Sequence, residues 1–195
     1  MAESLKIVAD NLAARLCSEI ESGENPVVLI DGYSGSGKSH FAELLKSAVF
    51  ANCKLTFHLV HMDDLYPGWD GLVAGGNYLD RNIISPLSKG KRAEYQVWDW
   101  AENTRGRASE PGNGWRLCEP GTPVMVEGCG SMTEVAADFA SLRIWIESPL
   151  ETRLARWKER ESEILRYYET TWGSQEQEHF EIHKPWTAAD LVIEN

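Results

Sequence analysis

The chain of 195 residues has the length of one domain, is 43% hydrophobic and 25% charged, and carries a formal net charge of −11. These values are typical of a globular protein with a sizeable core, so we expect a single domain over residues 1–195. The negative overall field repels nucleic acids and anionic membranes, and neither is an expected partner. Any phosphate group that binds must therefore be neutralised locally.

Cysteine spacing and the N-terminal residues bear on localisation. The four cysteines lie far apart, with no C-x-x-C pair: Cys17, Cys53, Cys118 and Cys129. This spacing predicts reduced thiols, as in a cytosolic protein, and neither a zinc site nor a disulfide framework. The first residues lack a basic segment followed by an apolar one, and no apolar run approaches the length of a membrane span. A cytoplasmic protein is therefore expected.

The first two predicted elements are a helix and a strand. Residues 4–21 are predicted to form an amphipathic helix, because apolar residues lie on one stripe: Leu5, Val8, Leu12, Leu16 and Ile20. Gly23 and Pro26 end this helix, which is expected to pack on a sheet and is assigned no chemistry. Residues 27–30 form a short apolar run that is typical of a strand buried on both faces.

A phosphate-binding loop follows this strand. Residues 32–39 match the pattern G-x-x-x-x-G-K-S, and apolar residues from Phe41 onward fall on one face of a helix. In this setting the backbone N–H groups of the loop and the N-terminus of the helix form an anion-binding site. Glycines have no side chain, so phosphates can approach the backbone closely there. Lys38 is expected to reach the β- and γ-phosphates of ATP, and Ser39 to bind Mg²⁺. The expected nucleotide-binding residues are Gly32, Tyr33, Ser34, Gly35, Ser36, Gly37, Lys38, Ser39 and His40. A glycine-rich turn that binds nothing is the alternative.

Two acidic residues, Asp63 and Asp64, follow the next predicted strand at residues 54–61. Ligands of open parallel sheets bind beyond the carboxyl ends of the strands, so both carboxylates are expected to face the phosphate loop. A kinase that acts on a hydroxyl group needs a carboxylate to accept the hydroxyl proton, and we assign this role to Asp63. Asp64 is expected to help hold hydrated Mg²⁺. The alternative is that this pair only caps a turn or a helix.

The middle of the chain mixes turn signals with short elements. Residues 67–76 are rich in glycine and are expected to form a flexible segment that closes over a substrate. A short helix is predicted over residues 78–87, with a break near Pro86, and residues 95–100 are predicted to be a strand. Residues 106–121 are polar and rich in glycine, and they are expected to form an exposed loop.

An aromatic and polar cluster lies at the end of the 95–100 strand, and it comprises Trp98, Asp99, Trp100 and Asn103. Aromatic faces hold a flat base or exclude water, while Asp99 or Asn103 supplies hydrogen-bond donors and acceptors. We interpret the cluster as a substrate site. Ordinary strand packing is the alternative, because alternation places Trp98 and Trp100 on one face and Asp99 on the other.

Two more buried strands are predicted, at residues 124–127 and 142–147. The first ends in Glu127, whose burial is costly unless the carboxylate is paired or near a metal, so we expect it to meet Mg²⁺ through water. A structural ion pair is the alternative. Residues 188–193 are predicted to be a final edge strand. The alternation of strands and helices predicts an α/β protein, a three-layer α/β/α P-loop NTPase fold with a five-stranded parallel sheet.

A capping box at residues 148–151 begins a helix that is predicted to extend to about residue 168, with a break near residue 161 as the alternative. Arg153, Arg156 and Arg160 share one face of this helix because of their spacing. Arginines aimed at a transferring phosphoryl group offset its developing charge, so we assign catalytic roles to Arg153 and Arg156 in a lid at about residues 150–170. A solvated face whose arginines pair with neighbouring glutamates is the alternative.

Together these motifs resemble the uridine kinase group of P-loop small-molecule kinases, which includes phosphoribulokinases and pantothenate kinases. The matching stretches are its phosphate loop (residues 31–39), its Asp-Ser-Phe-Tyr motif (62–66), its base-binding segment (98–105), its strand ending in Glu-Gly (124–128), its lid arginines (153–160) and its closing strand (189–193). The resemblance implies that Asp63 is the base. It also implies an acceptor site formed by Asp63, Tyr66, Trp98, Asp99, Trp100, Asn103 and Arg105.

Two positions depart from the pattern of this family. Asn103 stands where the family has a histidine that reads the pyrimidine, and Trp98 stands in place of a tyrosine. The phosphotransfer residues therefore match the family better than the residues that read the base.

The sequence therefore predicts a phosphotransferase that uses ATP and Mg²⁺ and acts on a hydroxyl of a small molecule. A uridine- or cytidine-like nucleoside is the leading acceptor. One alternative is a kinase of the same fold that acts on a sugar, a vitamin or a nucleotide, and another is a nucleotide-dependent switch that hydrolyses ATP slowly. The chain lacks Asn-Lys-x-Asp, His-Arg-Asp and Asp-Phe-Gly, which argues against a guanine-specific switch and a protein kinase. Assembly into a homo-oligomer is left open.

Overall fold

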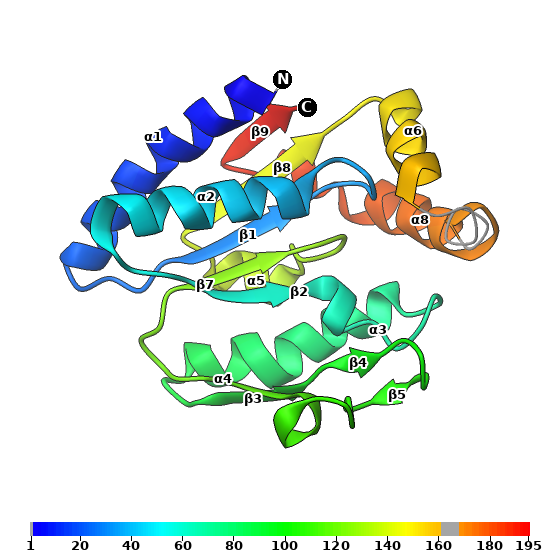
Figure 1. The fold of residues 1–195 in the computed structure, drawn as a ribbon, viewed down its shortest axis with the longest axis horizontal. Coiled ribbons are helices and arrows are strands. Elements are labelled where there is room, and N and C mark those ends of the chain that lie inside the picture. Colours follow the sequence, from blue (N-terminus) through cyan, green and yellow to red (C-terminus); the bar gives the residue numbers. More distant parts are fainter. Residues whose placement is uncertain (1, 161–167) are drawn as a thin grey trace.

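The apolar runs of the sequence form a central sheet of five parallel strands, in the order β2-β7-β1-β8-β9 (Figure 1). The computed structural model describes residues 2–160 and 168–195. In sheet order the strands are His58–His61 (β2), Val124–Glu127 (β7), Val27–Asp31 (β1), Leu142–Glu147 (β8) and Leu191–Glu194 (β9). The predicted α/β class, the five parallel strands and the edge position of the last strand are confirmed.

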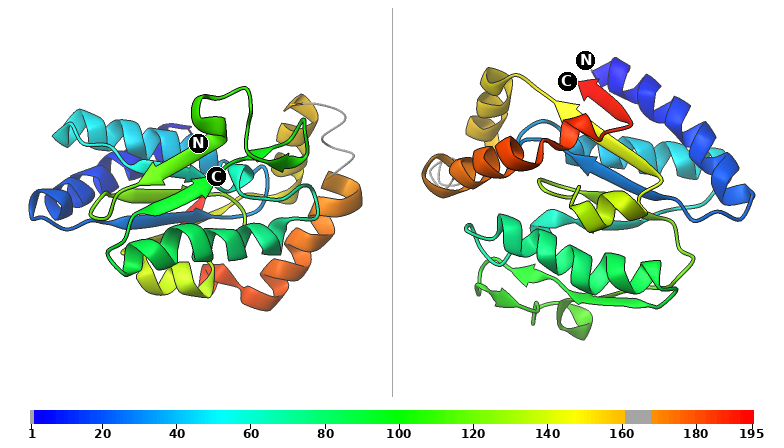
Figure 2. Two further views of the ribbon diagram at one scale, coloured as in Figure 1. Left: turned by 90° about the horizontal axis from the view of Figure 1, so that it is seen from below. Right: turned by 180° about the vertical axis from the view of Figure 1, so that it is seen from behind.

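Helices cover both faces of this sheet (Figure 2). On one face, α1 (Ala2–Glu21) and α2 (Lys38–Cys53) pack on each other and on Val28, Ile30 and Met125. On the other face lie α3 (Leu72–Leu79), α5 (Glu134–Phe139) and α8 (Gly173–His183), which pack on Leu29 and Val126. Alternate residues of β1 thus contact opposite layers, as the pleat of a strand requires. The predicted three-layer arrangement is confirmed.

The register of the strands brings three of their carboxyl ends to one level. Ile30 of β1 lies opposite Glu127 of β7, and Glu127 lies opposite His61 of β2. β1 is buried at every position, which agrees with an apolar run covered on both faces. Residues that follow these strands therefore share one edge of the sheet, where open α/β sheets bind their ligands.

The segment at residues 67–88 is more helical than predicted. α3 begins at Leu72 and continues into a π-helical turn, Asp80–Ile84 (η2), and a short helix, Ser85–Ser88 (α4). The flexible segment expected over residues 67–76 is therefore wrong in its second half. The prediction took Gly75 as part of a turn. A Cβ atom there would lie 2.5 Å from Cδ1 of Tyr66, so this glycine allows close packing inside a helix.

The strand predicted over residues 95–100 is divided between two small antiparallel pairs. Ala93–Gln96 (β3) pairs with Trp115–Cys118 (β6), and Trp98–Asp99 (β4) pairs with Thr104–Arg105 (β5). The loop expected over residues 106–121 therefore contains a strand and a short 3-10 helix, Pro111–Gly114 (η3). Val97 lies between the two pairs. Its N–H donates to the carbonyl of Gly114 and its carbonyl accepts from the N–H of Gly106, so its backbone is bonded outside both pairs. The pairing of β3 with β6 joins segments about 20 residues apart, so residue polarity alone did not reveal it.

Other boundaries shift by a few residues. β2 begins at His58, whereas the prediction began this strand at residue 54, because Lys54 ends α2 in a left-handed conformation with φ of 62°. The helix after β8 is Leu150–Arg160 (α6). Its predicted extension, and with it part of the predicted lid, falls on residues 161–167, which lie outside the described residues. The chain then continues through η4 (Tyr168–Trp172) to α8, and two more 3-10 turns are Met62–Asp64 (η1) and Pro185–Thr187 (η5). No helix in the described part of the chain is long and apolar enough to span a membrane.

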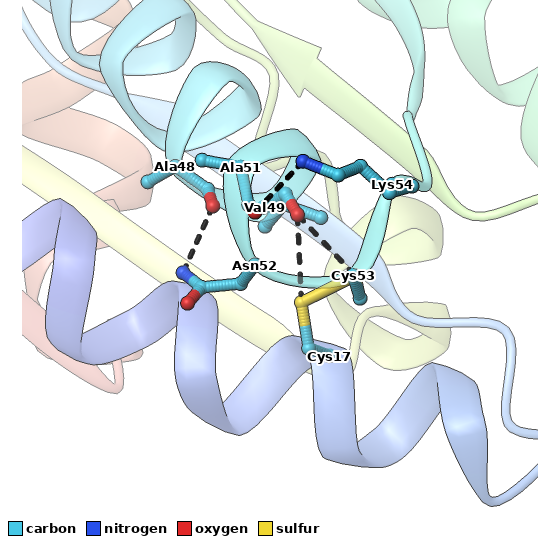
Figure 3. Close-up of a disulfide and its surroundings, with 7 residues drawn as sticks. All are labelled: Cys17, Ala48, Val49, Ala51, Asn52, Cys53 and Lys54. Carbon is cyan, nitrogen blue, oxygen red and sulfur yellow. Dashed lines mark hydrogen bonds between the residues drawn. A yellow bond between two sulfur atoms is a disulfide. The ribbon is translucent and has the colours of Figure 1, made fainter.

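A disulfide joins Cys17 of α1 to Cys53 at the end of α2 (Figure 3). The two Cα atoms are 5.9 Å apart, within the usual range for this bond. The expectation of reduced thiols is therefore wrong for this pair, whereas Cys118 and Cys129 are free and buried. The pairing depends on how α1 packs against α2, across a sequence separation of 36 residues, and the spacing of cysteines does not reveal such packing.

Replacing Cys17 and Cys53 together with alanine is expected to lower the free energy of unfolding by about 2–4 kcal/mol, because the crosslink restricts the unfolded chain. Urea unfolding without reductant measures this difference. Dithiothreitol should lower the stability of the wild type towards that of the variant and leave the variant unchanged. Equal stability of the two proteins without reductant would show that the crosslink contributes nothing.

Candidate functional site

A cavity of about 500 Å³ lies at the carboxyl ends of β1, β2 and β7. Its walls come from the phosphate loop, from the segments that follow β2 and β7, and from aromatic residues of later elements. The lining residues are Ser34, Gly35, Gly37, Lys38, Ser39, His40, Asp63, Tyr66, Trp69, Trp100, Glu127, Gly128, Cys129, Trp157 and Trp172. Residues that are remote in sequence thus meet at the predicted edge of the sheet.

The phosphate loop runs from the end of β1 to Lys38, the first residue of α2, so the predicted strand, loop and helix are confirmed. Gly35 and Gly37 have φ values of 78° and 102°, which glycine adopts without strain. A Cβ atom on Gly35 would lie 2.9 Å from the carbonyl oxygen of Arg153, so the loop also needs this glycine for its contact with α6.

Lys38 is buried within the loop. Its Nζ donates to the carbonyl oxygens of Gly32 at 2.8 Å and Tyr33 at 2.9 Å, and it lies 3.4 Å from Sγ of Cys129. Burial opposes the charge of Lys38, but the acidic groups around it, including Cys129 and Glu176, hold its pKa above the usual value. The loop therefore carries a fixed positive charge at neutral pH.

Ser39 and Glu127 form a pair of oxygen donors beside the loop. The Ser39 hydroxyl donates to Oε2 of Glu127 at 3.1 Å, and Nδ1 of His61 lies 2.6 Å from Oε1. This hydrogen bond to Glu127 raises the pKa of His61. Hydroxyl and carboxylate oxygens suit Mg²⁺, which usually takes only one or two protein carboxylates together with phosphates and water. The residues present therefore fit this ion, although no group of three or more His, Cys, Asp or Glu residues in the described chain is arranged to hold a metal alone.

The two acidic residues that follow β2 both lie in the 3-10 turn η1, but their side chains have different surroundings. Asp63 lines the cavity, and the loss of hydration within the cleft, followed by the nearby charge of Glu127, raises its pKa. Asp64 instead lies 3.5 Å from Arg107, and it is not among the described residues that line the cavity. Only one of the two predicted carboxylates thus faces the phosphate loop.

Of the predicted aromatic cluster, Trp100 reaches the cavity, where its Nε1 donates to the carbonyl oxygen of Asp63 at 2.9 Å. Trp98, Asp99, Asn103 and Arg105 are not among its described lining residues. Oδ1 of Asp99 accepts from two backbone amides, at residues 101 and 102, and Arg105 donates to backbone carbonyls at residues 64, 65 and 96. These side chains hold the backbone beside the cavity.

Four of the eight tryptophans line the cavity, and sequence reasoning predicted only Trp100 among them. Trp69 comes from the segment before α3, Trp157 from α6 and Trp172 from η4. Nε1 of Trp172 donates to Oγ of Ser34 at 2.9 Å. The unusual number of tryptophans was the one sign in the sequence of an aromatic site. Because they are dispersed along the chain, the sequence did not indicate which of them lie together.

Arg153 and Arg156 lie against the phosphate loop. Arg153 is buried, with its guanidinium carbon 4.4 Å from the ring centre of Tyr33 and its Nη1 3.7 Å from Oε2 of Glu176. Arg156 donates to the carbonyl oxygen of Gly35 at 2.9 Å. The solvated helix face considered as the alternative is therefore wrong for Arg153. Arg160 is the last residue of α6, and its side chain lies outside the described part of the structure.

Two buried carboxylates that sequence reasoning missed hold the site together. Glu176 of α8 is 1% exposed, accepts from the backbone N–H of Ser34 and lies 3.2 Å from Sγ of Cys129. Asp31 accepts from backbone amides at residues 32, 130 and 132, and its complete burial raises its pKa to about 6. Glu176 lies among polar helix residues, so nothing in the sequence distinguishes it from a surface glutamate.

The substitution Glu176→Gln is expected to lower the free energy of unfolding by about 3–5 kcal/mol, because it removes the buried negative charge that lies 3.7 Å from Nη1 of the buried Arg153. Chemical denaturation measures this loss. Glu178→Gln, on an exposed position of the same helix, is the matched control and should change little. In the double variant Arg153→Met/Glu176→Gln, part of the stability should return. A single variant as stable as the control would contradict a role for this ion pair.

The parallel sheet and the glycine-rich loop between β1 and α2 define a P-loop α/β protein. No protein-family model matches the chain, and no curated protein matches its sequence. A solved structure described as a "possible uridine kinase from Bacillus stearothermophilus" is similar with a TM-score of 0.65 and 18% identity, over 93% of this chain and 96% of the other. A "putative fructose transport system kinase from Silicibacter sp. TM1040" has a TM-score of 0.55 and 19% identity, over 92% and 98%. The chain thus has the fold of the P-loop small-molecule kinases, as the resemblance predicted.

Proposed function

We propose that the protein is a phosphotransferase that moves the γ-phosphoryl group of ATP to a hydroxyl group of a small molecule. The observation that carries this proposal is a cavity whose walls include both Lys38 and Ser39 of the phosphate loop and the carboxylates of Asp63 and Glu127. Both similar solved structures are described as kinases, which supports the reaction class. P-loop switches also hold Mg²⁺ with one carboxylate, so the feature that favours a kinase is the second carboxylate, Asp63, in the same cavity as Glu127.

In the proposed reaction the loop amides and Lys38 hold the β- and γ-phosphates. Asp63 orients the acceptor hydroxyl and takes up its proton on a carboxylate oxygen. The hydroxyl oxygen then bonds to the γ-phosphorus, the bond from that phosphorus to the bridging oxygen breaks, and ADP leaves. The raised pKa of Asp63 makes it a better proton acceptor than an ordinary surface aspartate.

Mg²⁺ would be held by Ser39 and Glu127, whose oxygens already lie together beside the loop. When bound, this ion neutralises charge that develops on the phosphates. Because Asp64 lies beside Arg107, we give it no direct ligand role, which narrows the metal site predicted from the sequence.

We also propose that Arg153 and Arg156 act from α6, which is the described part of the predicted lid of a single domain. Arg156 contacts the loop backbone directly, whereas Arg153 is buried behind Tyr33 and Glu176, so Arg156 is the better placed to meet a bound phosphate.

A nucleoside remains the leading acceptor and a sugar, vitamin or nucleotide the alternative. We retain the cytoplasm as the proposed location, although the crosslink between Cys17 and Cys53 is unusual for that compartment.

Lys38→Ala is expected to abolish phosphoryl transfer, because the loop loses the positive charge that meets the phosphates. The measurement is ADP release from ATP and Mg²⁺ across nucleosides, nucleotides, sugars and pantothenate. Lys46→Ala, on an outer position of the same helix, is the matched control and should keep full activity. Activity of the Lys38 variant within about tenfold of wild type would rule out the assigned phosphate loop.

Asp63→Asn is expected to lower turnover by about 10²-fold or more, because an amide cannot accept the hydroxyl proton. ATP binding, measured by titration calorimetry, should change little. Asp138→Asn, at an exposed position of α5, is the matched control and should keep full turnover. If the Asp63 variant kept its turnover with the best acceptor, the base would have to be a different residue.

A further inference from the structure

The residue that follows β9, Asn195, contacts the phosphate loop. Its side-chain Nδ2 donates to the carbonyl oxygen of Ser36 at 2.7 Å, across 159 residues of sequence. The edge strand predicted from the sequence ends at residue 193, so no role was expected for this side chain. The contact links the carboxyl end of the edge strand to the middle of the loop that is proposed to bind phosphates.

The main chain fixes the position of Asn195. Its N–H donates to the carbonyl oxygen of Glu147 at 2.9 Å, which extends the hydrogen bonds between β8 and β9 beyond Glu194. β8 also pairs in parallel with β1, from which the phosphate loop emerges. The side chain of Asn195 therefore starts from a fixed point on the sheet, and only its own torsions remain to be ordered when it binds the loop.

Gly37 leaves the space that this contact needs. A Cβ atom at residue 37 would collide with Nδ2 of Asn195. The residue also has φ of 102°, a conformation that favours glycine. The last glycine of the G-x-x-x-x-G-K-S pattern thus allows Asn195 to approach the peptide bond between Ser36 and Gly37.

This peptide bond is trans, so its carbonyl and its N–H group point in opposite directions. Rotation of the peptide unit is easy on the side of Gly37, since glycine tolerates many φ values. The hydrogen bond from Asn195 selects one orientation, in which the N–H of Gly37 points away from Asn195. Ser36 is completely buried, so its carbonyl would also be costly to leave without a partner.

The amides near this peptide bond divide into two groups. The N–H of Ser36 is used inside the loop, where it donates to the carbonyl of Tyr33 at 3.0 Å. The amides of residues 37–40 follow at the N-terminus of α2, and all four residues line the cavity. The first helical hydrogen bond runs from Phe41 to Gly37, so these four amides precede the hydrogen bonds of the helix and form the anion site.

We infer that Asn195 is a positioning residue of the phosphate site: by holding the carbonyl of Ser36, it directs the N–H of Gly37 towards the polyphosphate of the nucleotide. The inference rests on the proposed function, in which the loop amides bind the phosphates of ATP. In this role Asn195 touches the loop and not the nucleotide. Its contribution is therefore the same for every ligand that carries the polyphosphate, whatever base is attached.

The first test measures the binding of ATP and of inorganic tripolyphosphate, each with Mg²⁺, by titration calorimetry. Asn195→Leu keeps the approximate size of the side chain and removes the donor. It is expected to weaken both ligands by a similar factor of about 5- to 100-fold, because the carbonyl of Ser36 loses its partner. Asn195→Asp also lacks the donor and should weaken both ligands at least as much. Asn195→Gln keeps a donor and should recover part of the affinity that Asn195→Leu loses.

Asn52→Leu is the matched control for this substitution. Nδ2 of Asn52 also donates to a backbone carbonyl, that of Ala48 at 2.9 Å, but at the far end of α2 (Figure 3). The control should bind both ligands as tightly as the wild type. If Asn195→Leu lost affinity for ATP and not for tripolyphosphate, Asn195 would contact the base or the ribose and the inference would be overturned. Wild-type affinity of Asn195→Leu for both ligands would also overturn it.

Nuclear magnetic resonance of protein labelled with ¹⁵N-glycine observes the Gly37 amide directly. In the wild type, saturating tripolyphosphate is expected to move its proton resonance downfield, because an N–H that donates to an anion forms a strong hydrogen bond. In Asn195→Leu the change should be much smaller at saturation, an effect that a general loss of stability does not produce. A change of equal size in both proteins would contradict the positioning of this amide by Asn195.

Comparison with Lys38→Ala and with phosphoryl transfer separates this inference from the proposed function. ATP binding that Lys38→Ala loses and Asn195→Leu keeps would support the phosphate loop and overturn the role of Asn195. Equal weakening of ATP and tripolyphosphate in Asn195→Leu, with no phosphoryl transfer by the wild type to any acceptor, would support the role of Asn195 and overturn the kinase. Absence of binding of both ligands to the wild type would overturn both proposals.

Discussion

The site depends on how the backbone carbonyls of the phosphate loop are held. A loop that turns its amides towards an anion leaves carbonyl groups that need partners elsewhere. Lys38 donates hydrogen bonds to the carbonyl oxygens of Gly32 and Tyr33. Arg156 donates to that of Gly35, and the side chain of Asn195 donates to that of Ser36 at 2.7 Å. These donors come from α2, from α6 and from the residue after β9. The conformation of the loop is therefore a property of several elements together.

Charge compensation is the second constraint on this part of the molecule. Lys38, Arg153, Glu127 and Glu176 are all buried, and each would be costly to bury alone. They stand as pairs and hydrogen-bonded groups around the loop: Glu176 links Arg153 of α6 to the Ser34 amide, while Glu127 links Ser39 to His61. A site built in this way presents a fixed arrangement of charges to an incoming phosphate, so little reorganisation is needed at the moment of reaction.

The cavity combines charged and aromatic walls. Lys38, Asp63 and Glu127 line it together with Tyr66 and four tryptophans, and Nε1 of Trp172 donates to Ser34 of the phosphate loop itself. A base in this cavity would have to meet both a phosphoryl group and an acceptor hydroxyl.

The sequence by itself determined the strand, loop and helix over residues 27 to about 50, because periodicity and glycine spacing are local properties of the chain. It also predicted that Asp63 and Asp64 would face the phosphate loop, since ligands of open parallel sheets bind beyond the carboxyl ends of the strands, and Asp63 does line the cavity. Only the tertiary structure decided which residues complete the site. Trp69, Trp157, Trp172 and Glu176 come from segments whose local pattern does not differ from ordinary core or surface.

The same physical reason explains the remaining differences. Asp63 and Asp64 are adjacent in sequence, yet a 3-10 turn directs one into the cavity and the other towards Arg107. Gly75 resembles a turn residue until the ring of Tyr66 lies against it. Cys17 and Cys53 pair only because α1 packs on α2. In each case the outcome depends on a contact between distant segments, which propensity and spacing along the chain do not encode.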